Sequence, residues 1–152
     1  MELTKDSIIG LACDHSGFEA QQIMKHILIE KNIKFIDYGT HINLSCDYMD
    51  HVSPLCYDID KGYIFYGLCF CRTGQGVNIA ANKHEGIISA LVYGDFAAKM
   101  AVEHNGANVF CFPGFYRKKS LLKRQLEIIL ESNFLKGKYL RRKQKNLNVS
   151  KL

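Results

Sequence analysis

The chain has 152 residues, of which 47% are hydrophobic and 23% charged, so it can bury the core of one ordinary globular domain. It contains no apolar stretch of about eighteen residues, and its amino terminus lacks the basic flank and apolar run of a signal peptide, so we expect a cytoplasmic protein without a membrane partner. The formal net charge is +5, yet residues 1–116 hold 8 Lys and Arg against 13 Asp and Glu, whereas residues 117–152 hold 12 against 2.

Segments with strand-like and helix-like patterns alternate along the chain. The expected strands cover residues 8–13, 33–38, 63–71, 86–92 and 107–112. The expected helices cover residues 18–32, a stretch through the fifties, a stretch after Gly76, residues 95–104 and residues 117–133. This alternation predicts a three-layer Rossmann-like fold, an open parallel sheet of about five strands wound right-handedly with helices on both faces.

The second expected helix contains a proline, which affects where the helix can begin. Residues 41–48 are polar and predict a loop before this helix. Since proline is tolerated in the first turn of a helix, Pro54 favours a start near Ser53 over a start at Asp47.

The apolar run 63–71 is typical of a buried parallel strand, and open parallel sheets bind ligands at the carboxyl ends of their strands. Cys71 stands at that end. The loop after it contains two glycines, which let backbone NH groups turn toward an anion at the start of a helix. We therefore expect a thiol beside an anion hole. The loop consists of Arg72, Thr73, Gly74, Gln75 and Gly76.

Other polar residues fall at the ends of elements, and each has a purely structural alternative. Asp14 follows the first strand together with His15, and it could equally cap the first helix. His104, Asn105 and the glycine after them could be no more than a helix stop. Cys71 alone could be another small buried residue on its strand.

Two further patterns limit the chemistry. The Gly74-Gln75-Gly76 loop lacks the third glycine of the dinucleotide fingerprint, so we expect no nicotinamide cofactor. The six cysteines occur without a secretory signal, and four of them lie in strand-like runs, so we expect free thiols. The basic carboxy-terminal segment fits a solvated helix face, a nucleic-acid tail or a source of cations for a phosphorylated small molecule.

Five segments of the chain form one pattern. They are Cys13-Asp14-His15-Ser16-Gly17-Phe18, Asp47-Tyr48, Cys71-x-Thr73-Gly74-x-Gly76, Ile79-Ala80-Ala81-Asn82-Lys83 and His104-Asn105-x-x-Asn108-Val109. In order and spacing over nearly the whole chain, these segments resemble the type B ribose-5-phosphate isomerases. The resemblance implies interconversion of an aldose phosphate and its ketose through an enediolate, in the pentose phosphate pathway, with no organic cofactor and no metal. Isomerases of galactose 6-phosphate and allose 6-phosphate are relatives of this family.

The resemblance also implies roles for single residues. Cys71 corresponds to the base that moves a proton between C1 and C2, and the loop amides are expected to favour its thiolate. His104 corresponds to the acid that opens the sugar ring. A subclass carries a glutamate where this chain has Val77, so the chain resembles the cysteine type. The supporting roles fall on Thr73, Gly74 and Gly76 as the anion hole, on Asp14 at the ring oxygens, and on Tyr48 and Asn105 at the hydroxyls.

The phosphate ligands implied by the resemblance lie partly in the tail. His15 is expected to face the phosphate, and the arginine pair of the family corresponds to Lys138 and Arg142. The arginine that follows the fifth strand in the family corresponds to Phe115, and Arg117 could replace it if the turn is longer. Because the tail serves the neighbouring subunit in the family, we expect a homodimer, or a tetramer, in which residues 1–135 form the domain and 136–152 dock on the partner.

Arg72 stands where the family has the first glycine of its anion hole, and this departure leaves alternatives open. If the position requires positive φ, a side chain costs about 1 kcal/mol or more. The guanidinium could also bind substrate, as could Gln75 in the same loop. The alternatives are an isomerase of a six-carbon sugar phosphate and a family member that binds a phosphorylated ligand without catalysis. We expect no nucleic-acid partner, since no basic strand carries interleaved aromatic residues.

Overall fold

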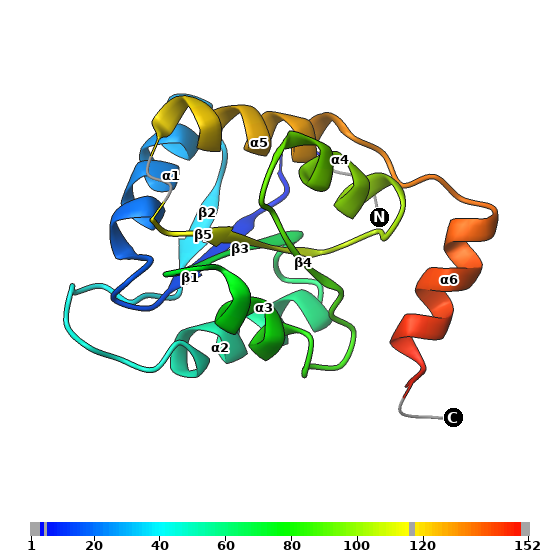
Figure 1. Ribbon diagram of the computed structural model, residues 1–152, viewed down its shortest axis with the longest axis horizontal. Helices are drawn as coiled ribbons and strands as arrows, with labels where there is room; N and C mark the ends of the chain where they lie inside the picture. The colour runs from blue at the N-terminus through cyan, green and yellow to red at the C-terminus, as the bar shows by residue number, and fades with distance from the viewer. Residues whose placement is uncertain (1–3, 5, 116–117, 150–152) are drawn as a thin grey trace.

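The computed structural model describes residues 4, 6–115 and 118–149 and confirms the predicted architecture (Figure 1). Five parallel strands form one sheet in the order β2-β1-β3-β5-β4. The strands are β1 (Ile9–Cys13), β2 (Phe35–Asp37), β3 (Tyr66–Cys71), β4 (Ser89–Leu91) and β5 (Val109–Pro113). The helices are α1 (Phe18–Glu30), α2 (Met49–Asp60), α3 (Gln75–Ala81), α4 (Asp95–Glu103), α5 (Lys119–Glu131) and α6 (Lys138–Leu147).

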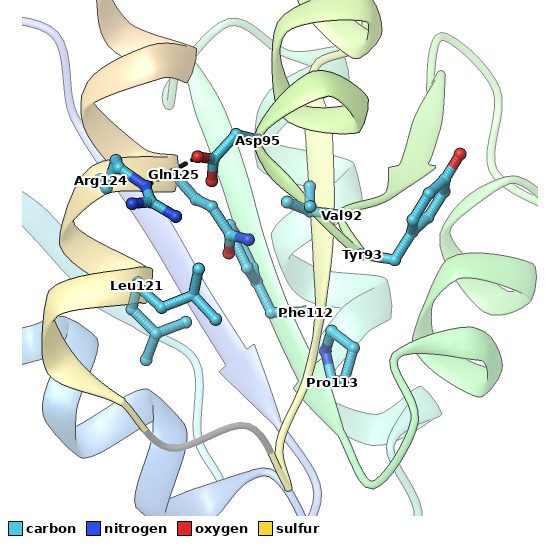
Figure 2. A pocket seen from close by; sticks show the side chains of 10 residues that line it. Val92, Tyr93, Asp95, Phe112, Pro113, Leu121, Arg124 and Gln125 are labelled. Carbon is cyan, nitrogen blue, oxygen red and sulfur yellow. Dashed lines mark ion pairs between the residues drawn. The ribbon is translucent and has the colours of Figure 1, made fainter.

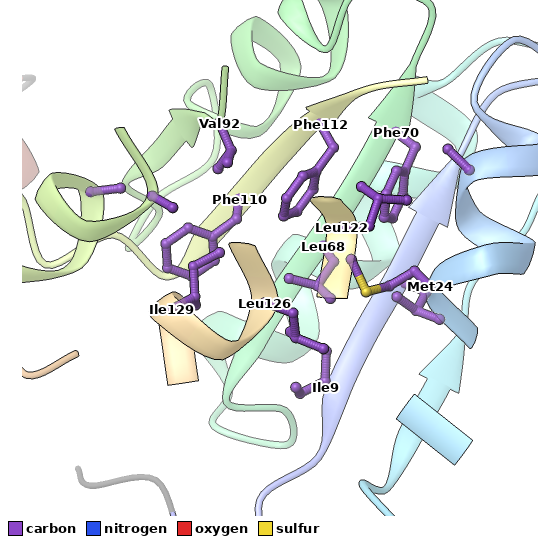
Figure 3. Packing of buried hydrophobic residues seen from close by; sticks show 14 of the residues in the cluster. Ile9, Met24, Leu68, Phe70, Val92, Phe110, Phe112, Leu122, Leu126 and Ile129 are labelled. Atoms are coloured by element: carbon purple, nitrogen blue, oxygen red, sulfur yellow. The ribbon is translucent and has the colours of Figure 1, made fainter. Parts of the chain in front are cut away.

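The helices cover both faces of the sheet, with α1, α4 and α5 on one face and α2 and α3 on the other (Figure 1). Alternation along β3 divides its side chains between the two layers. Leu68 and Phe70 enter the core under α1 and α5, where Phe70 stacks on Phe112 with ring centroids 5.3 Å apart (Figure 3). Cys69 and Cys71 point to the opposite layer, under α2 and α3. The predicted catalytic thiol therefore belongs to the α2–α3 side.

The expected start of the second helix near Ser53 is wrong. Helix α2 begins at Met49, and Pro54 lies inside it. A proline at this position removes one backbone hydrogen bond. The loss is offset because α2 buries Val52, Leu55 and Cys56 against the sheet.

Helix α6 forms a separate feature at the end of the chain. It has no buried residue and stands away from the sheet in Figure 1. Its link to the domain includes Lys143, whose Nζ donates a hydrogen bond of 2.8 Å to the carbonyl of Gly106. Burial lowers the pKa of Lys143 below the usual lysine value. Among the described residues, no helix is long and apolar enough to cross a membrane.

Candidate active site

The loops that follow β1, β3 and β5 meet at the carboxyl edge of the sheet, and two glycines allow them to touch. A Cβ at Gly114 would lie 2.8 Å from the carbonyl oxygens of both Cys71 and Ser16. A Cβ at Gly17 would lie 2.3 Å from the carbonyl oxygen of Phe70. The amide of Gly114 donates a hydrogen bond of 2.7 Å to the carbonyl of Cys71. Backbone contact therefore places the end of β3 directly between the other two loops.

Cys71 is 5% exposed at this edge. The loop after it makes the tight turn that its glycines predict. Gly74 adopts φ of +76°, and a Cβ there would lie 3.0 Å from the backbone of Phe112. The hydroxyl of Thr73 accepts a hydrogen bond of 3.3 Å from the amide of Gln75. A left-handed glycine and a short polar turn thus carry the chain from β3 into α3.

Arg72 fits this loop without backbone strain. Among the described residues, Asn32 is the only residue other than glycine with positive φ. The position that needs a left-handed glycine is therefore Gly74, two residues further on. The guanidinium of Arg72 is exposed and lines a cavity of about 270 Å³ together with His15 and Phe115. The structure thus places three charged or titratable side chains, those of His15, Glu19 and Arg72, around one polar cavity next to Cys71.

Asp14, His15 and Tyr48 lie around the same edge. The Oδ1 atom of Asp14, a residue only 8% exposed, accepts a hydrogen bond of 2.9 Å from the amide of Gly17. The Nδ1 atom of His15 lies 3.3 Å from the amide of Cys46, which donates to it and ties the loop before α2 to the cavity. The ring of Tyr48 packs against Gly76, where a Cβ would lie 2.9 Å from it.

His104 and Asn105 lie at the opposite edge of the sheet. His104 caps the carboxyl end of α4, before the start of β5. Its ring stacks on Tyr139 of α6, with centroids 4.3 Å apart. Lys138 and Arg142 also lie over the Tyr139 ring, at 5.2 and 5.8 Å from its centroid. The structure therefore brings these predicted residues together in a second cluster, but not with Cys71.

The distance between the two clusters follows from the strand register. Cys71 pairs with Pro113, the last residue of β5, whereas His104 precedes Val109, the first. Four strand residues at roughly 3.3 Å each separate these levels by about 13 Å. We refer to the two groups below as the thiol cluster (Asp14, His15, Tyr48, Cys71 and residues 72–76) and the histidine cluster (His104, Asn105, Tyr139, Lys138 and Arg142).

Four residues support these clusters but were not singled out from the sequence. Gly17 and Gly114 permit the close approach of the loops, and neither lies in a recognisable glycine motif. Asn82 exchanges two hydrogen bonds with the backbone of Ser89, and Asn108 bonds the backbone on both sides of Ile87. Gly17 and both asparagines belong to segments that carried the resemblance, so the order of these segments was the available signal.

The other described cysteines are free thiols, as expected. Burial raises the pKa of the Cys13 thiol and of the Cys56 thiol to about 12. A hydrogen bond with Cys111 and burial raise the pKa of Cys69. These thiols are protonated and buried in the core, with Cys13 and Cys69 on strands and Cys56 on α2, whereas Cys71 stands at the open edge of the sheet.

The family model and the related proteins that match this chain all point to one family. The sequence model described as Ribose/Galactose Isomerase matches residues 9–146. The putative sugar phosphate isomerase YwlF of Bacillus subtilis is 31% identical over 132 residues, which cover 86% of this chain and 89% of that protein. The ribose-5-phosphate isomerase B of Escherichia coli is 33% identical over 104 residues, which cover 68% of this chain and 70% of that protein.

Solved structures share the whole fold. A ribose 5-phosphate isomerase from Thermotoga maritima superimposes with a TM-score of 0.90 and 33% identity, covering 93% of this chain and 97% of that one. The ribose-5-phosphate isomerase B from Mycoplasma genitalium, solved with bound ribulose-5-phosphate, gives a TM-score of 0.90 and 29% identity, covering 97% and 99%. The likeness includes the region of α6 as well as the sheet.

Proposed function

The chain belongs to the ribose/galactose isomerase family of enzymes, and we propose that it interconverts ribose 5-phosphate and ribulose 5-phosphate. The observation that carries this proposal is the thiol cluster itself. Cys71 ends β3 at the open edge of the sheet, beside a polar cavity lined by His15 and Arg72. A base next to a phosphate-sized polar cavity is what an aldose phosphate requires for proton transfer near its carbonyl.

In the proposed mechanism, the thiolate of Cys71 takes the proton from C2 of the open-chain aldose and returns it to C1. The hydroxyl proton passes from O2 to O1 in the same sequence, so that no net proton or electron is gained. The enediolate oxygens would lie against the backbone amides of residues 73–76, with Gly74 turning these amides inward. This proton transfer requires neither a redox cofactor nor a metal, and we propose none.

The ring-opening acid in this proposal is His104 of a second copy of the chain. Within one chain the histidine cluster and the thiol cluster lie about 13 Å apart along the strand axis, too far for one substrate to touch both Cys71 and His104. A homodimer that places the amino edge of one sheet against the carboxyl edge of the other would complete both sites. Residues 136–152 would then dock on the partner and bring the tail cations with them.

The phosphate would be bound from both chains. His15 and Arg72 line the cavity of about 270 Å³ from one chain, and Phe115 closes the side where the family has an arginine. Lys138 and Arg142, which lie beside Tyr139, would enter from the partner. Arg72 thus restores a fork of hydrogen-bond donors that Phe115 does not supply.

The first test is the conversion of ribose 5-phosphate to ribulose 5-phosphate by the purified protein. We expect turnover that falls at least about 10³-fold in Cys71→Ala, because this change removes the base. Cys46→Ala, which removes a thiol from the loop before α2, should retain activity. Circular dichroism of both variants controls for folding.

The same assay separates the alternatives. Allose 6-phosphate and galactose 6-phosphate serve as alternative substrates, and faster turnover of either would identify a six-carbon isomerase. Binding of ribose 5-phosphate without turnover of any aldose phosphate would identify a member of the family that only binds its ligand. Full activity in Cys71→Ala would refute the assignment of the base.

A further inference from the structure

Helix α4 ends at His104, the ring-opening acid of the proposed reaction, and the domain fixes the backbone of this helix. At the start of α4, the Oδ2 atom of Asp95 forms an ion pair of 2.7 Å with Nε of Arg124 on α5 (Figure 2). The buried residues of α4 belong to the core of that face. At its end, the amide of His104 donates a hydrogen bond of 3.0 Å to the carbonyl of Met100. The main chain at the acid is therefore held by its own domain.

The imidazole ring of His104 has a different support. It stacks on the ring of Tyr139 in α6, with centroids 4.3 Å apart and ring planes 15° apart. No hydrogen bond or ion pair joins this imidazole to another described residue. Stacking covers the face of a ring and leaves the nitrogen atoms at its edge uncovered. Tyr139 thus fixes the plane of the acid without pairing with the proton that the acid must donate.

Tyr139 belongs to a narrow stripe through which α6 contacts the domain. The half-buried residues of this helix are Tyr139, Lys143 and Leu147, which are four residues apart and lie along one side, and its other residues are exposed. Lys143 donates a hydrogen bond of 2.8 Å to the carbonyl of Gly106, and Leu147 packs against the core. Two members of the stripe therefore hold the helix, whereas Tyr139 holds the side chain of His104.

The turn of α6 that supplies this ring also carries the two tail cations. Nζ of Lys138 lies 5.2 Å from the centroid of the Tyr139 ring, and Cζ of Arg142 lies 5.8 Å from it. In the proposed site these cations bind the phosphate of the sugar. Because one ring contacts both cations and the acid, a sugar phosphate held by the cations would meet His104 in a single orientation.

The alternative role for Tyr139 is to fasten α6 to the domain and nothing more. The two roles differ in the substrates that they affect. Loss of docking would withdraw the tail cations from every sugar phosphate. A misplaced acid would matter only for a sugar that enters as a ring, and a shift of about 1 Å in a reacting group can lower a rate about 100-fold.

We propose that Tyr139 is a positioning residue for ring opening, which holds the imidazole of His104 in the plane from which it gives a proton to the ring oxygen of the sugar phosphate. As the C1–O4 bond of the furanose breaks, His104 gives a proton to O4 and the hydroxyl on C1 releases one to water. The aldehyde thus forms with no net gain or loss of protons. This role rests on the isomerase reaction proposed above and on His104 as its acid.

The experiment compares ribose 5-phosphate, which enters as a ring, with erythrose 4-phosphate, whose phosphorylated C4 oxygen cannot close a furanose. We expect Tyr139→Leu to lower kcat/KM about 10- to 100-fold for ribose 5-phosphate and less than about threefold for erythrose 4-phosphate. Tyr139→Phe keeps a stacked ring and should stay within about twofold of the parent for both substrates. His104→Ala should show the same dependence on the ring, and adding Tyr139→Leu to it should cause no further loss.

Tyr57→Leu is the matched control. Tyr57 is an exposed tyrosine of α2 that also has a lysine over its ring, but it belongs to neither the thiol cluster nor the histidine cluster. This variant should leave both turnovers unchanged. Proton NMR of the His104 ring provides a measurement that needs no turnover. The resonance that disappears in His104→Ala should shift in Tyr139→Leu, because the ring current of Tyr139 is lost, and should keep its position in Tyr139→Phe.

Three outcomes overturn the role of Tyr139 and leave the isomerase intact. They are equal losses for both substrates in Tyr139→Leu, a His104 resonance that this change does not move, and a further loss in the double variant with His104→Ala. Failure of the proposed function has a different signature. A parent chain that turns over neither aldose phosphate would refute the isomerase, and full turnover of ribose 5-phosphate in His104→Ala would refute the acid, and either result removes the role of Tyr139 as well.

Discussion

The two edges of the sheet are built in opposite ways. At the carboxyl edge, three loops touch through Gly17 and Gly114, and Asp14 and Cys71 are almost fully buried among them. At the amino edge, His104 is held by a stacked ring of α6, a helix without a buried residue. One half of the proposed site is thus rigid before any substrate arrives, and the other half lies on an outlying surface. In the proposed dimer, this outlying half serves the site of a second copy of the chain.

Subunit complementation tests this division between the two edges. It has the largest expected effect, because two inactive variants should regain activity when they are mixed. Cys71→Ala and His104→Ala should each be inactive alone, because each lacks one reacting group in every site. Mixed and reassociated in equal amounts, they should recover about a quarter of the parent activity, since half the dimers are mixed and each contains one intact site of two. The measurement is ribulose 5-phosphate formation before and after reassociation.

Mass spectrometry of the intact assembly controls for the exchange of subunits in this experiment. A mixture that exchanges fully and stays inactive would contradict the shared site. It would also imply that His104 acts within its own chain after a rearrangement of α4 and α6, or that it does not act.

The sequence predicts the carboxyl edge well because its determinants are local. A strand of apolar residues that ends in Cys71 and continues into Gly74 and Gly76 indicates both the thiol and the turn. The amino edge depends on long-range packing. Neither the spacing of His104 nor the basic composition of the tail predicts that Tyr139 stacks on His104, or that α6 forms a helix at all. Likewise Pro54 suggested a later start of α2 because the compensating burial of that helix is not visible in the residues around it.

Removing the cation of the carboxyl edge alone should have an intermediate effect. Arg72→Gly restores the residue type of the family but removes a guanidinium from the cavity that His15 lines. A hydrogen bond to a charged group contributes about 1.5–3 kcal/mol, so we expect KM for ribose 5-phosphate to rise about tenfold or more, with a smaller change in kcat. Steady-state kinetics over a range of salt concentrations measures both constants.

Lys83→Ala removes an exposed cation from the end of α3 and serves as the control for a general loss of positive charge. An unchanged KM in Arg72→Gly would show that the phosphate depends on His15 and the tail cations alone. In that case the exposed amino edge, and not the carboxyl edge, would supply the main cations of the site.

The smallest expected effect concerns the thiols buried in the core, Cys13 on β1 and Cys56 on α2, which differ from Cys71 at the open edge. Burial raises the pKa of Cys13 and Cys56 to about 12. Alkylation of Cys56 in the folded chain should therefore be slow at pH 8 and rise about tenfold per pH unit toward pH 12, whereas in urea it should level off near the ordinary thiol pKa of about 8.5. Because the folded pKa is raised, the stabilisation from burying protonated thiols is fully present below about pH 9 and is lost as the pH rises toward 12.

Mass spectrometry of tryptic peptides after timed alkylation gives the rate for each cysteine. Equal rates for Cys56 at pH 8 in buffer and in urea would mean that the α2 layer opens readily, and the carboxyl edge would then be less rigid than its close loop contacts imply.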